Sequence, residues 1–372
     1  PTQLAREAAR CEMKICMLDP LFFPYHGGAE KVVYEVGKRL AKEHEITIFT
    51  SRLPGTEERE VIEGMEVVRY PCLYLERLPP PLPPPFSIAP LFVRHLLRLP
   101  HDIFHVHNRF WYYFGTMFAI KAMMKRKLVV TIHNARPSGI DFLTDLGGGL
   151  YDEVIGKRWF ELSDRITCTS RYARDATIPV SLHLKTHIIH NGVDVEHFNP
   201  AKGAGNVRER FGIPYEHRLL LCNARLVPQK GLSYLLEAFA MLRKDGETKD
   251  TWLMLIGKGP LREALLEQAR RLGVADRFVI TTGIHEEELP FYYNAADLFV
   301  LPSLYEPSAV VLYEALAAGK AIVATSVGGN EEIVSRGCGL FEPPRDPQAL
   351  SEKITLLLTH DRLRSGLGRA GR

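Results

Sequence analysis

Short apolar runs and amphipathic stretches alternate along the whole chain. Runs such as ICML and ITIF predict buried strands, and the spacing of Val32, Val33, Val36 and Leu40 predicts a helix. This alternation is typical of α/β domains with parallel sheets. The predicted strands of the first half are residues 13–18, 45–50, 65–71, 102–108, 127–134, 165–170 and 186–194. Those of the second half are 218–226, 251–257, 277–283, 297–303 and 321–326, with helices at 231–244 and 260–273.

The pattern restarts after about residue 195, which predicts two doubly wound, Rossmann-like domains. A chain of 372 residues fits this, because domains typically have about 100–200 residues. We expect an N-terminal domain at 1–195 and a C-terminal domain at 196–372. Such sheets bind ligands at the carboxyl ends of their strands, and clefts between domains are favoured sites. Residues that directly follow strands are therefore the first candidates for function.

Composition narrows the class of protein. The net charge is only +3, so we expect no nucleic-acid partner. The six cysteines are scattered without a C-x-x-C pair, which favours free thiols in a reducing compartment. No apolar run reaches the roughly 18 residues of a membrane span, and residues 1–12 lack the apolar core of a signal peptide. We therefore expect a cytoplasmic protein.

One segment, residues 78–100, differs from the rest. A stiff proline run precedes Leu91, Phe92, Leu96 and Leu97, which alternate with Arg94, His95 and Arg98. A short basic amphipathic helix can lie on a membrane interface, so residues 86–99 are a candidate for peripheral contact at the cytoplasmic face. An ordinary surface helix that packs on its own domain is the alternative.

Two cations follow the first strand of the second half. Arg225 and Lys230 stand between that strand and the next helix, where helix N-termini attract phosphate groups. Cationic side chains hold a diphosphate well, so this pair predicts a diphosphate site. Two solvated surface charges are the alternative. Gly257 ends the next strand in a tight turn that suits close approach of a ligand to the backbone.

Two glutamates bracket an apolar run near residue 310. Glu306 follows a strand, and residues 307–310 (Pro307, Ser308, Ala309 and Val310) are expected to form a first helical turn with free backbone N–H groups. Glu314 lies two turns further among apolar neighbours, where an unpaired charge is costly. A vicinal diol such as a ribose would satisfy this carboxylate. We therefore expect one glutamate to hold the transferred group and the other the nucleotide.

These motifs resemble a known family. EPSAVVLYE resembles the E-x7-E region of retaining glycosyltransferases of the group 1, or family 4, type. ARLVPQKG resembles their phosphate motif, GKGP their glycine turn, and GGAEKVVYE their N-terminal glycine loop and helix. HNGVD resembles the stretch that leads into their second domain. The resemblance spans residues 14–358, with the motifs in the family's order.

The resemblance implies a GT-B fold, with two Rossmann-like domains that face a cleft, and retaining transfer from a nucleotide diphosphate sugar. It implies that domain 1–195 lies on the acceptor side and that domain 196–372 binds the nucleotide sugar. It implies that Arg225 and Lys230 hold the diphosphate in place of a metal, so that no cofactor is needed. Glu314 would bind the ribose, and Glu306 would contact the donor sugar. Backbone N–H groups at Ser308, Ala309 and Val310 would also bind the substrate. Gly27 and Gly28 would bring backbone N–H groups near the phosphate. His133 matches the histidine that contacts the donor sugar, and His107 is an acceptor-side candidate.

Three classes of acceptor remain possible from the sequence: a sugar, a lipid-linked molecule and another small molecule. The sequence has no Asp-x-Asp pair, so a metal-dependent clamp is not expected. The resemblance suggests front-face attack, in which the leaving phosphate oxygen takes the acceptor proton. Two alternatives share the fold: a nucleotide-sugar epimerase and a non-catalytic nucleotide-sugar-binding protein. A dinucleotide-dependent dehydrogenase is disfavoured, because YHGGAEKVVYE lacks the G-x-G-x-x-G spacing.

Overall fold

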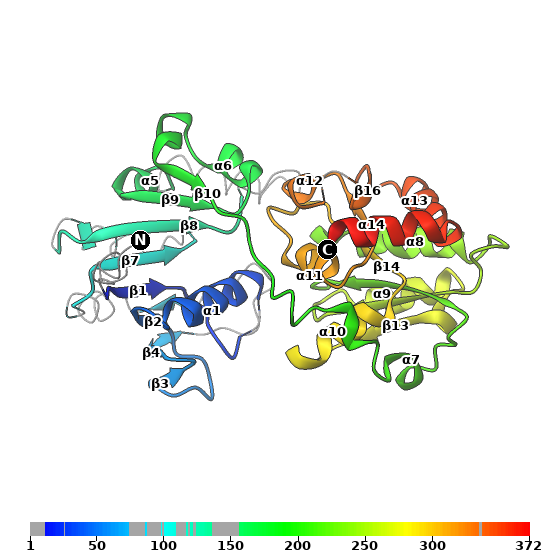
Figure 1. The fold of residues 1–372 in the computed structure, drawn as a ribbon, viewed down its shortest axis with the longest axis horizontal. Helices are drawn as coiled ribbons and strands as arrows, with labels where there is room; N and C mark the ends of the chain where they lie inside the picture. Colours follow the sequence, from blue (N-terminus) through cyan, green and yellow to red (C-terminus); the bar gives the residue numbers. More distant parts are fainter. Residues whose placement is uncertain are drawn as a thin grey trace, which may run out of the picture. The chain divides into compact units, whose positions relative to one another are not determined.

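The chain folds into two compact units, and each is described by itself. The computed structural model describes residues 12–25, 27–73, 86–87, 98, 100–108, 117, 120–121, 124–135, 156–334 and 337–372 (Figure 1). The described residues up to His190 form unit 1, and those from Asn191 onward form unit 2. This boundary lies five residues before the one expected from the sequence.

Unit 1 is built on an eight-stranded sheet with the strand order β10-β9-β8-β7-β1-β2-β4-β3. All neighbours pair in parallel except β3 and β4, so the predicted parallel sheet is confirmed. The strands are β1 (Lys14–Leu18), β2 (Glu45–Ser51), β3 (Arg59–Ile62), β4 (Met65–Tyr70), β7 (Ile103–His107), β8 (Lys127–Ile132), β9 (Arg165–Cys168) and β10 (Thr186–Ile188), with a separate pair β5 (Cys72–Leu73) and β6 (Phe86–Ser87).

Strand β3 was not predicted. It forms an antiparallel hairpin with β4, and the two residues between them, Glu63 and Gly64, both have positive φ, at 49° and 79°. Such two-residue turns match the twist of paired strands. The pair Glu-Gly is a weaker signal for this turn than Asn-Gly, and β3 is largely exposed, so the apolar pattern did not mark it.

Helix α1 (Gly28–Leu40) covers one face of this sheet, as its apolar spacing predicted. Val33 packs into a core that also contains Ile15 and Met17 of β1. Gly37 is buried, and a Cβ there would lie 2.5 Å from the sulfur of Met65, so a larger residue would force the Met65 side chain to move. The other described helices of unit 1 are α5 (Lys157–Leu162), α6 (Arg171–Thr177) and the 3-10 segment η5 (Val180–Lys185).

Unit 2 contains a fully parallel six-stranded sheet with the order β13-β12-β11-β14-β15-β16. Its strands are β11 (Arg218–Asn223), β12 (Thr251–Ile256), β13 (Phe278–Thr281), β14 (Leu298–Leu301), β15 (Ile322–Thr325) and β16 (Gly339–Glu342). The first five confirm predicted strands. Edge strand β16 was missed, because its four residues include only two large apolar side chains.

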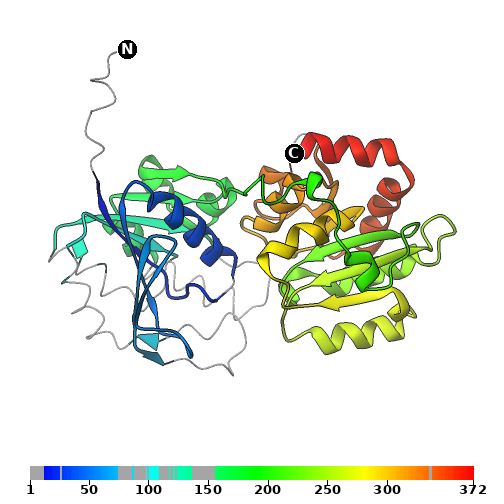
Figure 2. The same ribbon diagram turned by 60° about the horizontal axis from the view of Figure 1, so that its bottom comes forward.

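Helices cover both faces of this sheet, as a doubly wound fold requires (Figure 2). Leu220 and Val300 face a core shared with α8 (Leu232–Leu242), α9 (Arg262–Arg271), α13 (Pro347–Thr359) and α14 (Asp361–Gly371). Leu221 and Leu301 face a second core shared with α7 (Val207–Arg210), α10 (Leu289–Ala295), α11 (Val310–Ala317) and α12 (Asn330–Ile333). The remaining 3-10 segments are η6 (Pro200–Lys202), η7 (Pro228–Lys230), η8 (Ala275–Arg277) and η9 (Glu286–Glu288).

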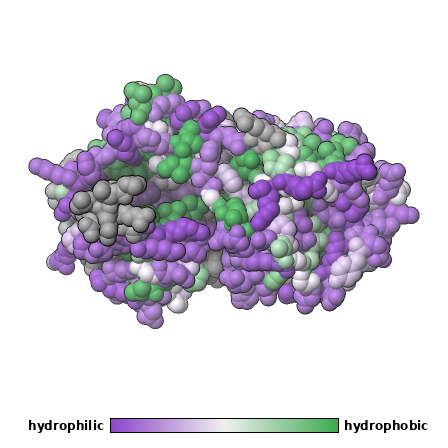
Figure 3. Space-filling view, in the orientation of Figure 1, coloured by the Kyte–Doolittle hydropathy of each residue, from purple (hydrophilic) through white to green (hydrophobic). Residues whose placement is uncertain are grey.

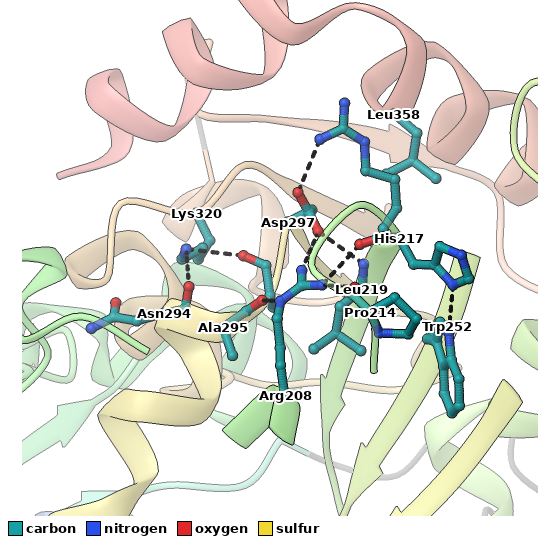
Figure 4. A network of polar contacts seen from close by, with 12 residues as sticks. Arg208, Pro214, His217, Leu219, Trp252, Asn294, Ala295, Asp297, Lys320 and Leu358 are labelled. Carbon is teal, nitrogen blue, oxygen red and sulfur yellow. Dashed lines mark hydrogen bonds and ion pairs between the residues drawn. The ribbon is translucent and has the colours of Figure 1, made fainter. Parts of the chain in front are cut away.

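A polar network closes the amino-terminal edge of this sheet (Figure 4). Asp297, just before β14, accepts hydrogen bonds from Arg208 at 2.8 Å, Arg218 at 3.2 Å and the backbone N–H of Leu219 at 2.9 Å. Arg208 also donates to the carbonyls of Pro214, His217 and Ala295. The network therefore joins α7, α10, β11 and β14 at the edge opposite to the carboxyl ends of the strands.

Most of the surface in Figure 3 is hydrophilic, and the apolar spots on this face are small and separated. Within the described part of the chain, no helix is long and apolar enough to cross a membrane. The candidate membrane contact at 86–99 lies largely outside the described residues.

Candidate active site

Strands β11 and β14 are neighbours in the sheet although β12 and β13 separate them in sequence. This is the point at which the strand order reverses, and open parallel sheets bind ligands there, at the carboxyl ends. The loops that follow these two strands carry Lys230 and Glu306, so two predicted site residues come together at this point.

Lys230 and Glu306 form an ion pair. The Lys230 Nζ donates to Oε2 of Glu306, and the same oxygen accepts from the Ser303 hydroxyl at 3.2 Å. The two charged side chains are only 14% and 9% exposed. The backbone N–H of Gly329 donates to the Glu306 carbonyl at 2.9 Å, which ties the loop after β15 to the same place. The pair is thus largely buried and held from three loops.

Gly231 explains why the two loops approach so closely. Its φ is 61°, and a Cβ at this position would lie 2.1 Å from the carbonyl oxygen of Pro302. Any other residue would push the loops apart. The backbone N–H of Leu304 donates to the Gln229 carbonyl at 2.8 Å and joins the loops directly. Glycine at this position therefore permits the Lys230–Glu306 contact.

Arg225 lies on the same loop as Lys230 but is exposed, and among the described residues its guanidinium forms no hydrogen bond or ion pair. Gly257, after β12, lies against this loop: a Cβ there would meet the Ala224 carbonyl oxygen at 2.0 Å. The glycine turn thus supports the backbone beside Arg225. The site therefore combines a fixed cation, Lys230, with a cation that is free to meet an anion.

Helix α11 begins at Val310, not at Pro307 as expected from the sequence. Pro307, Ser308 and Ala309 are irregular, and Ala309 is the N-cap with an extended backbone. The Ser308 hydroxyl instead accepts a hydrogen bond from the Asn191 amide at 3.2 Å. The Leu312 N–H donates to the Ala309 carbonyl at 3.1 Å, so the N–H groups that the helix start can offer to a ligand are those of Val310 and Val311.

Glu314 is 3% exposed and accepts a hydrogen bond from the Tyr293 hydroxyl at 2.7 Å. The Asn223 amide, at the end of β11, donates to the same hydroxyl at 3.2 Å. Burial and the nearby Glu314 charge raise the pKa of Tyr293 well above its ordinary value, so the phenol stays a donor. These contacts place Glu314 at the carboxyl edge of the sheet. They also explain how the Glu314 carboxylate is accommodated among apolar neighbours.

In unit 1, His107 and His133 contact each other. The Nδ1 of His107 lies 3.0 Å from the Nε2 of His133, and the rings stack with an interplanar angle of 20°. His107 ends β7 and His133 follows β8, so both lie at the carboxyl edge as predicted. Burial lowers the pKa of His133 to about 3 and that of His107 well below its ordinary value. Both rings are therefore neutral at physiological pH.

Asn108 supports this histidine pair. It has a left-handed φ of 64°, and its side-chain carbonyl accepts from the backbone N–H of His133 at 3.2 Å. Asparagine tolerates this backbone conformation better than most residues. His105, by contrast, bonds to the Thr131 hydroxyl at 2.6 Å, a structural contact between β7 and β8.

Gly27 is the N-cap of α1 and Gly28 its first residue. A Cβ on Gly27 would lie 2.1 Å from Oε2 of Glu30, so the Glu30 carboxylate folds back over the helix N-terminus. An acid in the first turn complements the helix dipole. A phosphate near Gly27 and Gly28 would first have to displace this side chain.

Sequence reasoning did not identify Tyr293 and Ser303, which donate to the two glutamates, or Asn223, which donates to Tyr293. Asn223 and Ser303 had a usable signal, because Asn223 is the polar last residue of β11 and Ser303 ends the predicted strand 297–303. Tyr293 and Ser303 reach the glutamates through tertiary packing. Within the described residues, no group of acids, histidines and cysteines could hold a metal ion.

Comparison with known proteins matches both halves of the chain to family models. The model described as glycosyl transferases group 1 matches residues 205–372, and the model described as Glycosyltransferase Family 4 matches residues 26–197. A GDP-mannose-dependent alpha-(1-6)-phosphatidylinositol monomannoside mannosyltransferase of Mycolicibacterium smegmatis is 30% identical over 94% of this chain and 91% of the relative.

Solved structures share the fold over nearly the full length. Sucrose-phosphate synthase from Thermosynechococcus elongatus is 21% identical, with a TM-score of 0.80, over 97% of this chain and 93% of its own. HepE from Anabaena, solved with UDP-glucose, is 20% identical, with a TM-score of 0.77, over 97% and 93%.

Proposed function

The chain belongs to the glycosyltransferases of group 1 and family 4, with a GT-B fold, and we propose that it transfers a hexose from a nucleotide diphosphate sugar to a hydroxyl acceptor with retention of configuration. The observation that carries this proposal is the buried Lys230–Glu306 pair at the switch point of unit 2, with Arg225 exposed on the same loop.

Lys230 and Arg225 supply what departure of a nucleoside diphosphate requires. Negative charge grows on the leaving phosphate as the bond to the anomeric carbon breaks, and preorganised cations stabilise that charge. Lys230 is already fixed by Glu306, whose carboxylate is itself held by the Ser303 hydroxyl, so little reorganisation is needed. With these cations in place, we propose that a metal ion is not needed to hold the diphosphate and that no cofactor takes part.

Glu314 is proposed to bind the ribose of the donor. An ionised carboxylate accepts several hydrogen bonds, and the Tyr293 hydroxyl is one donor to Glu314. In the proposed complex, two vicinal hydroxyl groups of the ribose would donate to the same carboxylate.

Retention is proposed to follow from attack on the face that the leaving group vacates. The acceptor oxygen bonds to the anomeric carbon, the carbon–oxygen bond to the phosphate breaks, and a phosphate oxygen takes the acceptor proton. Glu306 is engaged by Lys230 and Ser303, so we assign it to positioning of the donor rather than to nucleophilic attack.

The donor and acceptor identities rest on a relative alone. The mycobacterial relative is named for GDP-mannose and a phosphatidylinositol mannoside, so GDP-mannose with an inositol-containing lipid is the first pair to test. A lipid acceptor would fit a cytoplasmic protein that contacts the membrane through residues 86–99.

The test is calorimetric binding of GDP-mannose, UDP-glucose and ADP-glucose in the presence of EDTA, followed by transfer assays. We expect saturable binding of one donor, loss of that binding in Lys230→Met, and a product whose anomeric configuration by NMR matches the donor. Inverted product would overturn retention, and a strict requirement for divalent metal would overturn metal independence. Donor turnover without any acceptor would indicate an epimerase, and binding without turnover a non-catalytic protein.

A further inference from the structure

The contact between His107 and His133 also determines which ring nitrogens carry protons. An N···N distance of 3.0 Å is a hydrogen-bond distance, so one nitrogen carries the proton and the other accepts it. A neutral imidazole has one N–H and one bare nitrogen. Because both rings are neutral, the pair has only two arrangements, and each fixes all four nitrogens.

In the first arrangement His107 donates from Nδ1, its Nε2 is bare, and His133 carries its proton on Nδ1. In the second His133 donates from Nε2, its Nδ1 is bare, and His107 carries its proton on Nε2. The Nε2 of His107 is buried and finds no hydrogen-bond partner in the described part of the chain. A buried N–H without an acceptor is rarer than an acceptor that lacks a donor. This favours the first arrangement.

Neighbouring titratable groups do not reverse this preference. Leu18 pairs with Val106 across β1 and β7, so Asp19 and His107 come next on adjacent strands. An ionised Asp19 would favour a proton on Nε2 of His107. Burial and the charge of Glu30 raise the pKa of Asp19 well above its ordinary value, which favours its neutral form. His105, with ring centroids 4.2 Å from His107, is also neutral because burial lowers its pKa to about 4.

We propose that His107 is a positioning residue: it donates Nδ1–H to Nε2 of His133 and so fixes His133 as the tautomer that presents an N–H at Nδ1. This inference rests on the proposed function, because it assigns the role of His133 in transfer. His133 then donates a hydrogen bond to a substrate oxygen and does not act as a general base. The partner it recognises is a sugar hydroxyl or phosphate oxygen with a free lone pair.

The tautomer is measured directly by long-range ¹⁵N–¹H correlation NMR on the full chain labelled with [¹⁵N]histidine. His133 signals are assigned from their absence in His133→Gln. We expect a protonated Nδ1 and a bare Nε2 in the unsubstituted protein. In His107→Phe the stacked ring stays but the hydrogen bond is lost, and we expect His133 to become a mixture of tautomers. A proton on Nε2 in the unsubstituted protein, or no change in His107→Phe, would overturn the proposal.

Kinetic measurements distinguish a positioning role of His107 from a purely structural one. An asparagine amide can place an N–H near the position of Nδ1, whereas a glutamine amide reaches the position of Nε2. We expect kcat/KM to fall about tenfold in His107→Phe and His107→Gln and to recover to within about threefold in His107→Asn. His105→Asn is the matched control, since it removes a buried ring that bonds to Thr131, and the His133 tautomer should stay unchanged. Equal losses in His107→Asn and His107→Gln would contradict the assignment.

The two proposals fail in distinguishable ways. The NMR measurement needs no substrate, so it tests the tautomer even if the protein has no transfer activity. If the protein shows the expected tautomer but transfers no sugar, only the proposed function is overturned. If His107→Phe does not fold, as judged by circular dichroism, the comparison of His107→Asn with His107→Gln decides the proposal.

Discussion

Lys230 and Glu306 are 76 residues apart in the chain, and they form one ion pair at the ends of two adjacent strands. An anion that binds Lys230 must therefore share it with Glu306 or replace Glu306 as its partner. The cation is held in place before substrate arrives, which is the arrangement that catalysis by fixed charges requires.

Replacing Lys230 by methionine should lower kcat/KM for transfer by about 10²–10³, the range found when one preorganised donor to a developing oxyanion is lost. Binding of free nucleoside diphosphate should weaken as well, because the same charge meets the phosphate in the ground state. Steady-state kinetics and calorimetry measure the two effects. Lys249→Met, which removes an exposed lysine before β12, is the control and should leave both unchanged. Full activity in Lys230→Met would remove the phosphate assignment.

Replacing Glu314 by glutamine should weaken binding of ribose nucleotides and reduce the preference for ribose over 2′-deoxyribose. An amide accepts at only one of its two positions, so it cannot take up two hydroxyl donors and Tyr293 together. Competition between GDP and 2′-deoxy-GDP measures this preference directly. Tyr293→Phe keeps the carboxylate and should lower affinity by no more than about tenfold. An unchanged preference in Glu314→Gln would show that the ribose lies elsewhere.

Replacing Asp297 by asparagine should destabilise unit 2 by about 2–4 kcal/mol without weakening donor binding. The substitution leaves Arg208 and Arg218 without their shared anion at a poorly exposed position, where loss of one partner is costly. Urea unfolding gives the stability, and calorimetry gives donor affinity. Asp361→Asn is the matched control, because Asp361 pairs with Arg218 and Arg364 but is 66% exposed. It should change stability by less than about 1 kcal/mol.

Glu342 should make stability fall as pH rises. Burial raises its pKa from 4.5 to about 8, so the folded protein keeps a proton that the unfolded chain loses above about pH 4.5. The contribution of the protonated acid is complete below that pH and is lost as the pH approaches 8, at up to about 1.4 kcal/mol per pH unit. Glu342→Gln cannot ionise, so its free energy of unfolding should exceed that of the unsubstituted protein at pH 8. Parallel pH profiles of unfolding for the two proteins would contradict this.

The sequence predicted the parts of the fold that depend on periodicity and missed those that depend on neighbours. Buried parallel strands such as β11 and β12 are continuous apolar runs, and they were found. Strand β3 is held by its hairpin partner and β16 by pairing at the edge of the sheet, so neither has a strong pattern of its own.

The same distinction holds within the site. Lys230 and Glu306 were found because each follows a strand. The start of α11 was placed three residues too early, because proline commonly opens a helix and the pattern could not show that Ser308 is engaged by Asn191. That Glu314 binds Tyr293 and that His107 bonds to His133 depends on side-chain directions, which spacing alone does not give.

The reversal of strand order in unit 2 also has a consequence for folding. Lys230 and Glu306 can meet only after β14 has paired with β11, across all the residues of β12 and β13 in sequence, so the proposed diphosphate site is a long-range contact and forms late. A nucleotide that binds there recognises only the completed unit. It should therefore raise the unfolding temperature of unit 2 in proportion to the logarithm of its concentration, while it acts on unit 1 only through contacts of its own. A nucleotide that binds as proposed would thereby help to keep unit 2 folded.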